Sequence, residues 1–182
     1  MTDRQERVHD KMVDLFNVGR SGDVVKMAAE GLAVAGELRS ARPELAADIY
    51  YVLGDSLIEC FEYVKGLGLL EQARALAVEA GERSALGDVL NSLGMYHDLQ
   101  GEHKKAVAEY EQSRAIAVEL GNRARTLVNL ARCLSWQGQH GRAVTRLKQA
   151  WAFFQEQGDA ERQARTGKNL GEALRAQAQA EA

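Results

Sequence analysis

The chain repeats itself with a period of 37–40 residues, and this repeat constrains its fold more than any other feature. A leucine followed by a small residue recurs at spacings of 40, 37 and 40: Leu53-Gly54, Leu93-Gly94, Leu130-Ala131 and Leu170-Gly171. A second series recurs at spacings of 40 and 37: Gly81, Gly121 and Gly158. Two independent series with one period predict stacked copies of a single supersecondary unit.

Each unit is predicted to contain two helices. In residues 84–121, apolar side chains follow the helical i, i+3, i+4, i+7 spacing on both sides of Gly101. The two stripes consist of Leu86, Val89, Leu90, Leu93 and His97, then Ala106, Val107, Tyr110 and Ala117. Gly121 is predicted to end the second helix in the left-handed conformation that glycine favours. Small residues are expected where the two helices approach closely: Gly94, Ala106, Ala131 and Ala143.

Extending the pattern in both directions predicts an all-α chain of about nine helices. Their ranges are 5–19, 23–39, 45–65, 67–80, 84–99, 102–120, 123–137, 140–157 and 160–180. Pro43, the single proline, is expected near the first turn of the third helix, where proline is tolerated. Gly66-Leu67-Gly68 has the G-x-G pattern of a phosphate-binding loop, but no strand precedes it and no third glycine follows at the required spacing. It is therefore interpreted as a hairpin turn.

The length of 182 residues predicts a single domain. Within it, 1–42 forms a divergent first helix pair, the repeats cover 45–81, 84–121 and 122–158, and 160–182 is a capping helix. The composition, 46% hydrophobic and 27% charged, is that of a folded globular protein. The net charge of −3 excludes a polycation that binds nucleic acid through its overall charge.

Targeting and redox signals are weak. No apolar run approaches the roughly 18 residues of a membrane helix, and no signal peptide is visible, so a cytoplasmic location without membrane partners is expected. Cys60 and Cys133 stand in unrelated apolar contexts. They are interpreted as small buried hydrophobes rather than as a disulfide or a metal-binding pair.

Catalytic motifs are missing from the sequence. It contains no P-loop, no G-x-S-x-G, no H-E-x-x-H and no C-x-x-C. None of the four histidines, His9, His97, His103 and His140, has a histidine four residues away. His97 is expected at the boundary of the hairpin core. The sequence therefore predicts a protein that is not an enzyme, with no catalytic residues, no metal ligands and no cofactor.

At Leu90-x-x-Leu93-Gly94-x-x-His97, followed by Ala106-x-x-x-Tyr110, the chain resembles the tetratricopeptide repeat (TPR) family. The resemblance runs from about residue 50 to the C-terminus and is weak before Pro43. The long period is similar to the 40-residue TPR variant of signalling adaptors and bacterial regulators. The resemblance implies an α-solenoid, a right-handed superhelix of antiparallel helix pairs, whose concave face is lined by the first helix of each pair.

In TPR proteins, residues at fixed offsets from the signature leucine line this groove, and the resemblance carries four sets over to this chain. The first two sets are largely acidic: Asp48, Tyr51, Asp55 and Glu59, then Asp88, Asn91, Met95 and Asp98. The last two are largely basic: Arg125, Val128, Arg132 and Trp136, then Arg165, Lys168 and Arg175. The whole chain is divided in the same way, with a net −8 in residues 1–120 and a net +5 in residues 121–182.

These features favour a scaffold that binds a protein or an extended peptide, oriented by groove ends of opposite charge. The heat-shock-chaperone carboxylate clamp is not favoured, because Tyr51 and Asp55 replace its lysine and asparagine and only Asn91 matches. Nucleic-acid binding is not favoured either, because Trp136 alone interleaves with the basic residues.

The alternative is a regulatory or self-association module of a bacterial TPR-type transcriptional or signalling regulator. Trp151, Phe153 and Phe154 crowd one predicted helix and span more than one stripe. At least one of them is therefore expected to point away from the core of its own hairpin, where it either forms a homodimer contact through the C-terminal hairpin or packs under the last helix.

Overall fold

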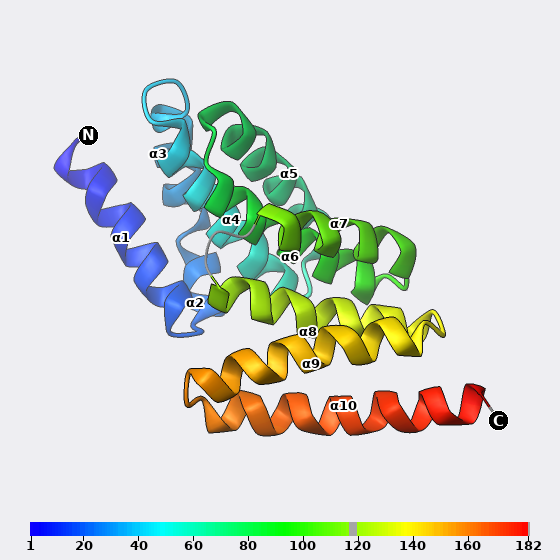
Figure 1. Ribbon diagram of the computed structural model, residues 1–182. Coiled ribbons are helices and arrows are strands. Elements are labelled where there is room, and N and C mark those ends of the chain that lie inside the picture. The colour runs from blue at the N-terminus through cyan, green and yellow to red at the C-terminus, as the bar shows by residue number, and fades with distance from the viewer. Residues whose placement is uncertain (117–119, 182) are drawn as a thin grey trace. The chain divides into compact units, whose positions relative to one another are not determined.

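The computed structural model describes residues 1–116 and 120–181, and side chains in all of this range except 120–122. The described residues form helices and no strand, which confirms the all-α prediction (Figure 1). None of these helices combines the length and the apolar composition that crossing a bilayer requires. The helices are α1 (Asp3–Asn17), α2 (Ser21–Lys26), α3 (Ala28–Leu38), α4 (Pro43–Glu59), α5 (Tyr63–Ala80), α6 (Arg83–Leu99), α7 (His103–Ile116), α8 (Leu120–Trp136), α9 (His140–Glu156) and α10 (Ala160–Ala180).

The repeat appears in the backbone at the loops that join helices. Phe61, Gly101 and Gly138 follow α4, α6 and α8 at spacings of 40 and 37, and each has a positive φ. Gly81 after α5 and Gly158 after α9, the other two glycines of the second series, also have positive φ. The prediction for Gly121 is wrong: this residue lies inside α8, which begins at Leu120, and residues 117–119 before it lie outside the described part.

The predicted turn at Gly66-Leu67-Gly68 is also wrong, because these residues lie inside α5. Gly66 is needed for packing. A Cβ atom on Gly66 would lie 2.8 Å from the carbonyl oxygen of Gly54 and 2.7 Å from Cδ1 of Ile58. The repeat register agrees, since Gly66 stands 40 residues before Ala106. The glycine therefore marks the close approach of α4 and α5, and the turn lies at Phe61 instead.

Two further differences concern the helix ranges. The predicted helix 23–39 is divided into α2 and α3 at Met27, so the described residues contain ten helices instead of about nine. Residue type does not predict this break, since Met27 is neither proline nor glycine. The predicted helix 102–120 is described as α7 up to Ile116; residues 117–119 lie outside the described part, and Leu120, the predicted end, is instead the first residue of α8. Pro43 is the first residue of α4, in agreement with its predicted place.

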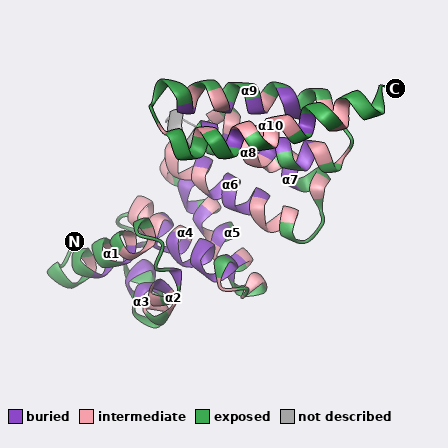
Figure 2. Ribbon diagram, turned by 90° about the horizontal axis from the view of Figure 1, so that it is seen from below, coloured by how far each residue is buried: buried purple, intermediate pink, exposed green. Residues whose placement is uncertain are grey.

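The chain forms two compact units, residues 1–92 and 93–182, which divide within α6. In the first unit, α4 is the central helix and contacts α1, α2, α3 and α5. Almost every residue of α4 from Ala46 to Ile58 is buried, which Figure 2 shows as a nearly continuous buried ribbon. This explains why α4 carries apolar side chains around most of its circumference.

In the second unit, α9 packs against both α8 and α10, and α7 packs against α8 (Figure 1). Alanine and leucine dominate the core: Ala106, Tyr110, Leu130, Ala131, Cys133, Leu134, Ala143, Val144, Leu147 and Ala173. Gly94 makes room for the buried ring of Tyr110, since a Cβ atom on Gly94 would lie 2.7 Å from ring carbons. In both units, the small residue after the signature leucine thus allows two helices to pack closely.

Phe61→Gly is expected to raise the free energy of unfolding by about 0.5–1 kcal/mol. Phe61 has φ of 64° where the matching loops carry Gly101 and Gly138, and a side chain in this conformation costs about 1 kcal/mol. The ring is 77% exposed, so little packing is lost. Urea unfolding measures the change. Phe61→Ala is the control, because it removes the ring and keeps the backbone cost; if it stabilised the protein as much as glycine did, the backbone explanation would fail.

Candidate functional site

A groove of about 420 Å³ lies between α8 and α10 in the second unit. Its floor is apolar, formed by Ala131, Leu147 and Ala173, all of which are buried. Polar side chains surround the floor: Arg132, Ser135, Asn169 and Glu172. Trp136, which is 71% exposed, also lines this α8–α10 groove. A dry floor with a polar rim is the usual composition of a site that binds a side chain of a partner.

A second hollow of about 320 Å³ adjoins the first, since Val128 lines both. Three arginines face this arginine hollow, Arg125 from α8 and Arg162 and Arg165 from α10. Asn129, Phe154 and Thr166 complete the lining, and the Arg162 guanidinium also pairs with Asp159 at 3.1 Å. Three guanidinium groups beside one small volume create a positive potential that attracts carboxylates and phosphates.

The predicted groove residues in α8 all line these hollows: Arg125 and Val128 line the arginine hollow, and Val128, Arg132 and Trp136 line the α8–α10 groove. In α10, Arg165 lines the arginine hollow, whereas Lys168 lines neither. Met95 of α6 is half-buried and also lines neither. Ser135, Asn169 and Glu172 in the groove and Arg162 in the arginine hollow were not among the predicted residues. Glu172 could have been found, because it stands two residues after the signature Leu170.

Asp98 and Arg132 were predicted as separate ligand contacts, but they form an ion pair. Nε and Nη2 of Arg132 donate to Oδ2 of Asp98 at 2.9 and 2.6 Å. The Asp98 side chain is 8% exposed and that of Arg132 is 51% exposed. The other oxygen, Oδ1, lies 2.9 Å from Nδ1 of His103. The imidazole of His103 in turn stacks on Trp136, with ring centroids 6.1 Å apart.

The pKa of Asp98 follows from these contacts. Burial acts to raise the pKa, but hydrogen bonds from the Cys133 thiol, Arg132 and His103 outweigh it and hold the pKa below its usual range. The same carboxylate and the same burial act on the thiol: desolvation, then the hydrogen bond to Asp98, raise the pKa of Cys133. The carboxylate is therefore ionised and the thiol protonated near neutral pH.

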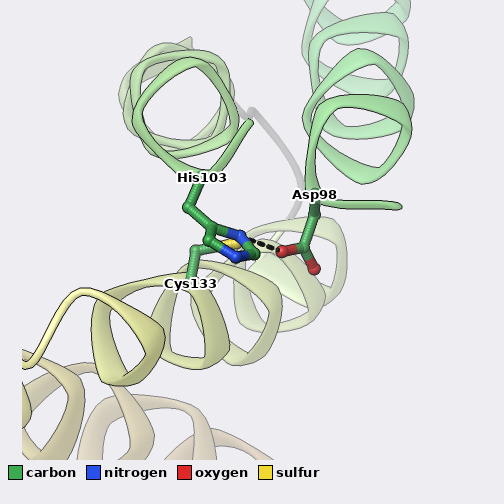
Figure 3. Close-up of side chains that lie close together, drawn as sticks. All are labelled: Asp98, His103 and Cys133. Carbon is green, nitrogen blue, oxygen red and sulfur yellow. Dashed lines mark hydrogen bonds and ion pairs between the residues drawn. The ribbon is translucent and has the colours of Figure 1, made fainter. Parts of the chain in front are cut away.

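Asp98, His103 and Cys133 converge from three helices (Figure 3). One possible ligand atom from each residue lies within 4.8 Å of those from the other two. The sequence indicated no metal ligands, and Cys133 was predicted only to be a small buried hydrophobe. Cys133 is indeed fully buried, whereas Cys60, predicted to be buried as well, is only half-buried. Its neighbours stand 35 and 30 residues earlier in the chain, so no local motif could reveal the group.

In the first unit, two of the predicted groove residues contact α1. Oδ2 of Asp48 lies 3.6 Å from Nε2 of His9, and the ring of Tyr51 meets that of Phe16 edge-on at 5.5 Å. Asp55 is buried. Of the remaining predicted residues, Asn91 is buried and Asp88 half-buried, both in the part of α6 that belongs to this unit. These side chains therefore have structural neighbours that the sequence pattern did not indicate.

The aromatic residues of α9 pack mostly within the second unit. Phe154 is buried with Ala124, Leu127 and Ala150. Trp151 lies under α10, since a Cβ atom on Gly167 would be 3.3 Å from its indole nitrogen. Phe153 is half-buried and packs against Phe154 at a centroid distance of 5.6 Å. His97, expected at a core boundary, is 14% exposed and lies 2.7 Å from Glu102.

Comparisons with known proteins agree with this architecture. The sequence profile of the tetratricopeptide repeat family matches residues 45–117. No curated protein sequence matches the chain significantly. Among solved structures, BtubC (BKLC) from P. vanneervenii has a TM-score of 0.79 at 20% identity, over 95% of this chain and 72% of that one.

Two other structures show the same fold. A Podosopora anserina putative kinesin light chain with nearly identical TPR-like repeats has a TM-score of 0.72 at 19% identity, over 98% of this chain and 90% of that one. MamA has a TM-score of 0.61 at 21% identity, over 85% of this chain and 81% of that one. Residues 45–117 thus match the tetratricopeptide repeat family, and the chain has the α-solenoid fold of these TPR-repeat structures.

Proposed function

We propose that this chain is a non-enzymatic scaffold that binds an acidic, extended segment of a partner protein along the face formed by α8 and α10. The observation that carries the proposal is the continuity of two unlike hollows on this face. The arginine hollow is lined by three arginines, of which Arg162 also pairs with Asp159, and the adjoining α8–α10 groove has an apolar floor. An extended peptide with a carboxylate and an apolar side chain complements both.

The lengths involved fit such a ligand. Arg125 and Trp136 lie 11 residues apart on α8, which corresponds to about 16 Å along a helix. An extended peptide covers that length with about five residues. The ion pair with Asp98 fixes the side chain of Arg132, which lies between Arg125 and Trp136 on α8. A preformed arrangement of this kind reduces the entropy that binding must overcome.

The test is selection of peptides from a displayed random library on the full chain, followed by fluorescence anisotropy with the selected peptide. We expect the selected peptides to be rich in Asp and Glu. Arg162→Glu/Arg165→Glu is expected to weaken binding by tenfold or more, about 1.4 kcal/mol, because each reversal replaces an attraction by a repulsion. Both residues lie in the first two turns of α10, where glutamate is compatible with the helix dipole.

Lys148→Glu is the matched control, since Lys148 is an exposed residue of α9 that lines neither hollow. It makes the same type of charge change and is expected to leave the affinity nearly unchanged. Selected peptides that are neutral or basic, or peptides that bind the double variant as tightly as the wild type, would contradict the proposal.

The regulatory module and the homodimer through the C-terminal hairpin stay predictions. Trp151 and Phe154 are engaged within the unit, and Phe153, which is half-buried against the same core cluster, is the residue of this group that we test. Light scattering on the purified chain tests this alternative, because a dimer that Phe153→Ala converts to a monomer would favour self-association.

A further inference from the structure

We propose that Asp98, His103 and Cys133 form a binding site for a zinc-class transition metal ion in the second unit. The three residues come from the end of α6, the start of α7 and the last turn of α8, and their side chains point toward one another in Figure 3. One carboxylate oxygen, one imidazole nitrogen and one sulfur all lie within 4.8 Å. The proposal is independent of peptide binding on the α8–α10 face.

The ligand chemistry selects the class of metal. Thiolate and imidazole are ligands of Zn²⁺ and its neighbours, whereas Mg²⁺ and Ca²⁺ require a shell of oxygens. Zinc bonds of about 2.0–2.3 Å in a tetrahedron place ligand atoms roughly 3.3–3.7 Å apart. The observed spacing within 4.8 Å closes to that value with side-chain movements of about 1 Å. Three protein ligands leave the fourth position for water.

The surroundings of the three ligands suit a metal. Arg132 holds Oδ2 of Asp98 through two hydrogen bonds, which orients the carboxylate and leaves Oδ1 for the ion. In the present arrangement Oδ1 contacts Nδ1 of His103 at 2.9 Å, and the metal would replace this hydrogen bond. His103 is 31% exposed and stacks on Trp136, so the site has both a route from solvent and a fixed imidazole.

A buried hydroxyl beside the cluster is a second, independent observation. Tyr110 is fully buried, and its hydroxyl finds no hydrogen-bond partner among the described residues. Burial raises the pKa of Tyr110 and the charges of Cys133 and Asp98 raise it further, whereas Arg132 lowers it through its charge and a polar contact with the hydroxyl, so the hydroxyl lies within electrostatic reach of the cluster. A buried hydroxyl without a partner is costly, and a metal-bound water would supply one.

The repeat itself provides a comparison, because the fold does not need this residue set. One repeat earlier, the positions that correspond to Asp98, His103 and Cys133 are occupied by Ile58, Tyr63 and Tyr96. One repeat later, they are occupied by Ser135, His140 and Ala173. Neither of these other sets contains three metal ligands. The combination of carboxylate, imidazole and thiol therefore occurs once among these three copies.

Binding must displace the thiol proton, since the ligand is the thiolate. The step is Cys133–SH plus M²⁺ giving Cys133–S–M⁺ plus H⁺, with no change of oxidation state. The bound charge of the ion is then offset by the thiolate and by the Asp98 carboxylate. Metal affinity is therefore expected to rise about tenfold for each pH unit in the range where the free thiol is protonated.

Cobalt(II) is the probe, titrated into the full reduced chain after removal of adventitious metal. We expect one cobalt ion per chain, a thiolate-to-cobalt charge-transfer band in the near ultraviolet, tetrahedral d–d bands in the visible, and loss of both on addition of zinc. Cys133→Ala and His103→Tyr are each expected to weaken binding by more than about 100-fold, because even outer-shell groups contribute about 10–100-fold.

The variants are chosen so that loss of binding is not mistaken for loss of folding. Alanine and tyrosine already stand at the matching repeat positions, Ala173 and Tyr63, and circular dichroism checks that each variant stays helical. Cys60→Ala and His140→Tyr are the matched controls and are expected to keep the bands. Absence of the charge-transfer band in the wild type, its persistence in Cys133→Ala, or an affinity independent of pH would each overturn the proposal.

Discussion

Replacing Gly66 by leucine is expected to lower the free energy of unfolding by about 3 kcal/mol or more. Even a single Cβ atom at this position would lie 2.8 Å from the Gly54 carbonyl oxygen and 2.7 Å from Ile58. The first contact is with backbone, which cannot turn away as a side chain can. The helices α4 and α5 would have to separate, and overpacking of this kind commonly costs 1–3 kcal/mol or more. Urea unfolding followed by circular dichroism measures the loss.

Gly68→Leu provides the matched control two residues further along α5. Nothing lies within 4 Å of a Cβ atom built on Gly68, and the residue is exposed. Leucine has a higher helix propensity than glycine, so this variant is expected to gain about 0.5–1 kcal/mol. The two substitutions should therefore move the unfolding midpoint in opposite directions. Equal effects would mean that the approach of α4 and α5 does not limit the volume at Gly66.

The second large effect is expected for Arg132→Ala, which should cost about 2–3 kcal/mol at neutral pH. The variant leaves the Asp98 carboxylate, only 8% exposed, without the two hydrogen bonds that Arg132 donates to it. A buried carboxylate that loses its cationic partner costs more than a lost exposed ion pair, even though the Cys133 thiol and His103 still contact Asp98. The partial exposure of Arg132 keeps the expected value below that of a fully buried pair.

The pH dependence of this loss follows from the lowered pKa of Asp98. A carboxyl whose pKa is lower in the folded state contributes stability above its unfolded pKa, near 4, and loses it as the pH falls through the folded value. The difference between the wild type and Arg132→Ala should therefore be largest at neutral pH and should shrink below about pH 4. Urea unfolding across this range checks both the size and the sign.

Arg142→Ala is the comparison for an exposed ion pair. Its guanidinium lies 3.3 Å from Glu111, but 53% of the Arg142 side chain is exposed, and Glu111 also contacts Arg114 and Arg146. A loss within about 1 kcal/mol is expected. If Arg132→Ala cost no more than this, burial of Asp98 would not be the source of its stabilising effect.

Much of the fold follows from the sequence because the relevant signals are local. The apolar spacing around Leu90 and Leu93 places both residues in the core, and both are buried. Gly81 and Gly158 stand where the chain needs a positive φ, and both have one. By contrast, position 66 is a glycine because two helices approach each other closely there. The sequence alone did not distinguish a glycine needed for close packing from one needed for a positive φ.

The candidate site divides in the same way. The repeat register by itself determined that Arg125, Val128, Arg132 and Trp136 share one face of α8, because helical periodicity fixes which side chains project together. Only the tertiary structure decided that Asp98 pairs with Arg132, that Asp48 and Tyr51 contact α1, and that Asp98, His103 and Cys133 meet. Such contacts depend on the distance and rotation between packed helices, which a period of 3.6 residues within each helix does not encode.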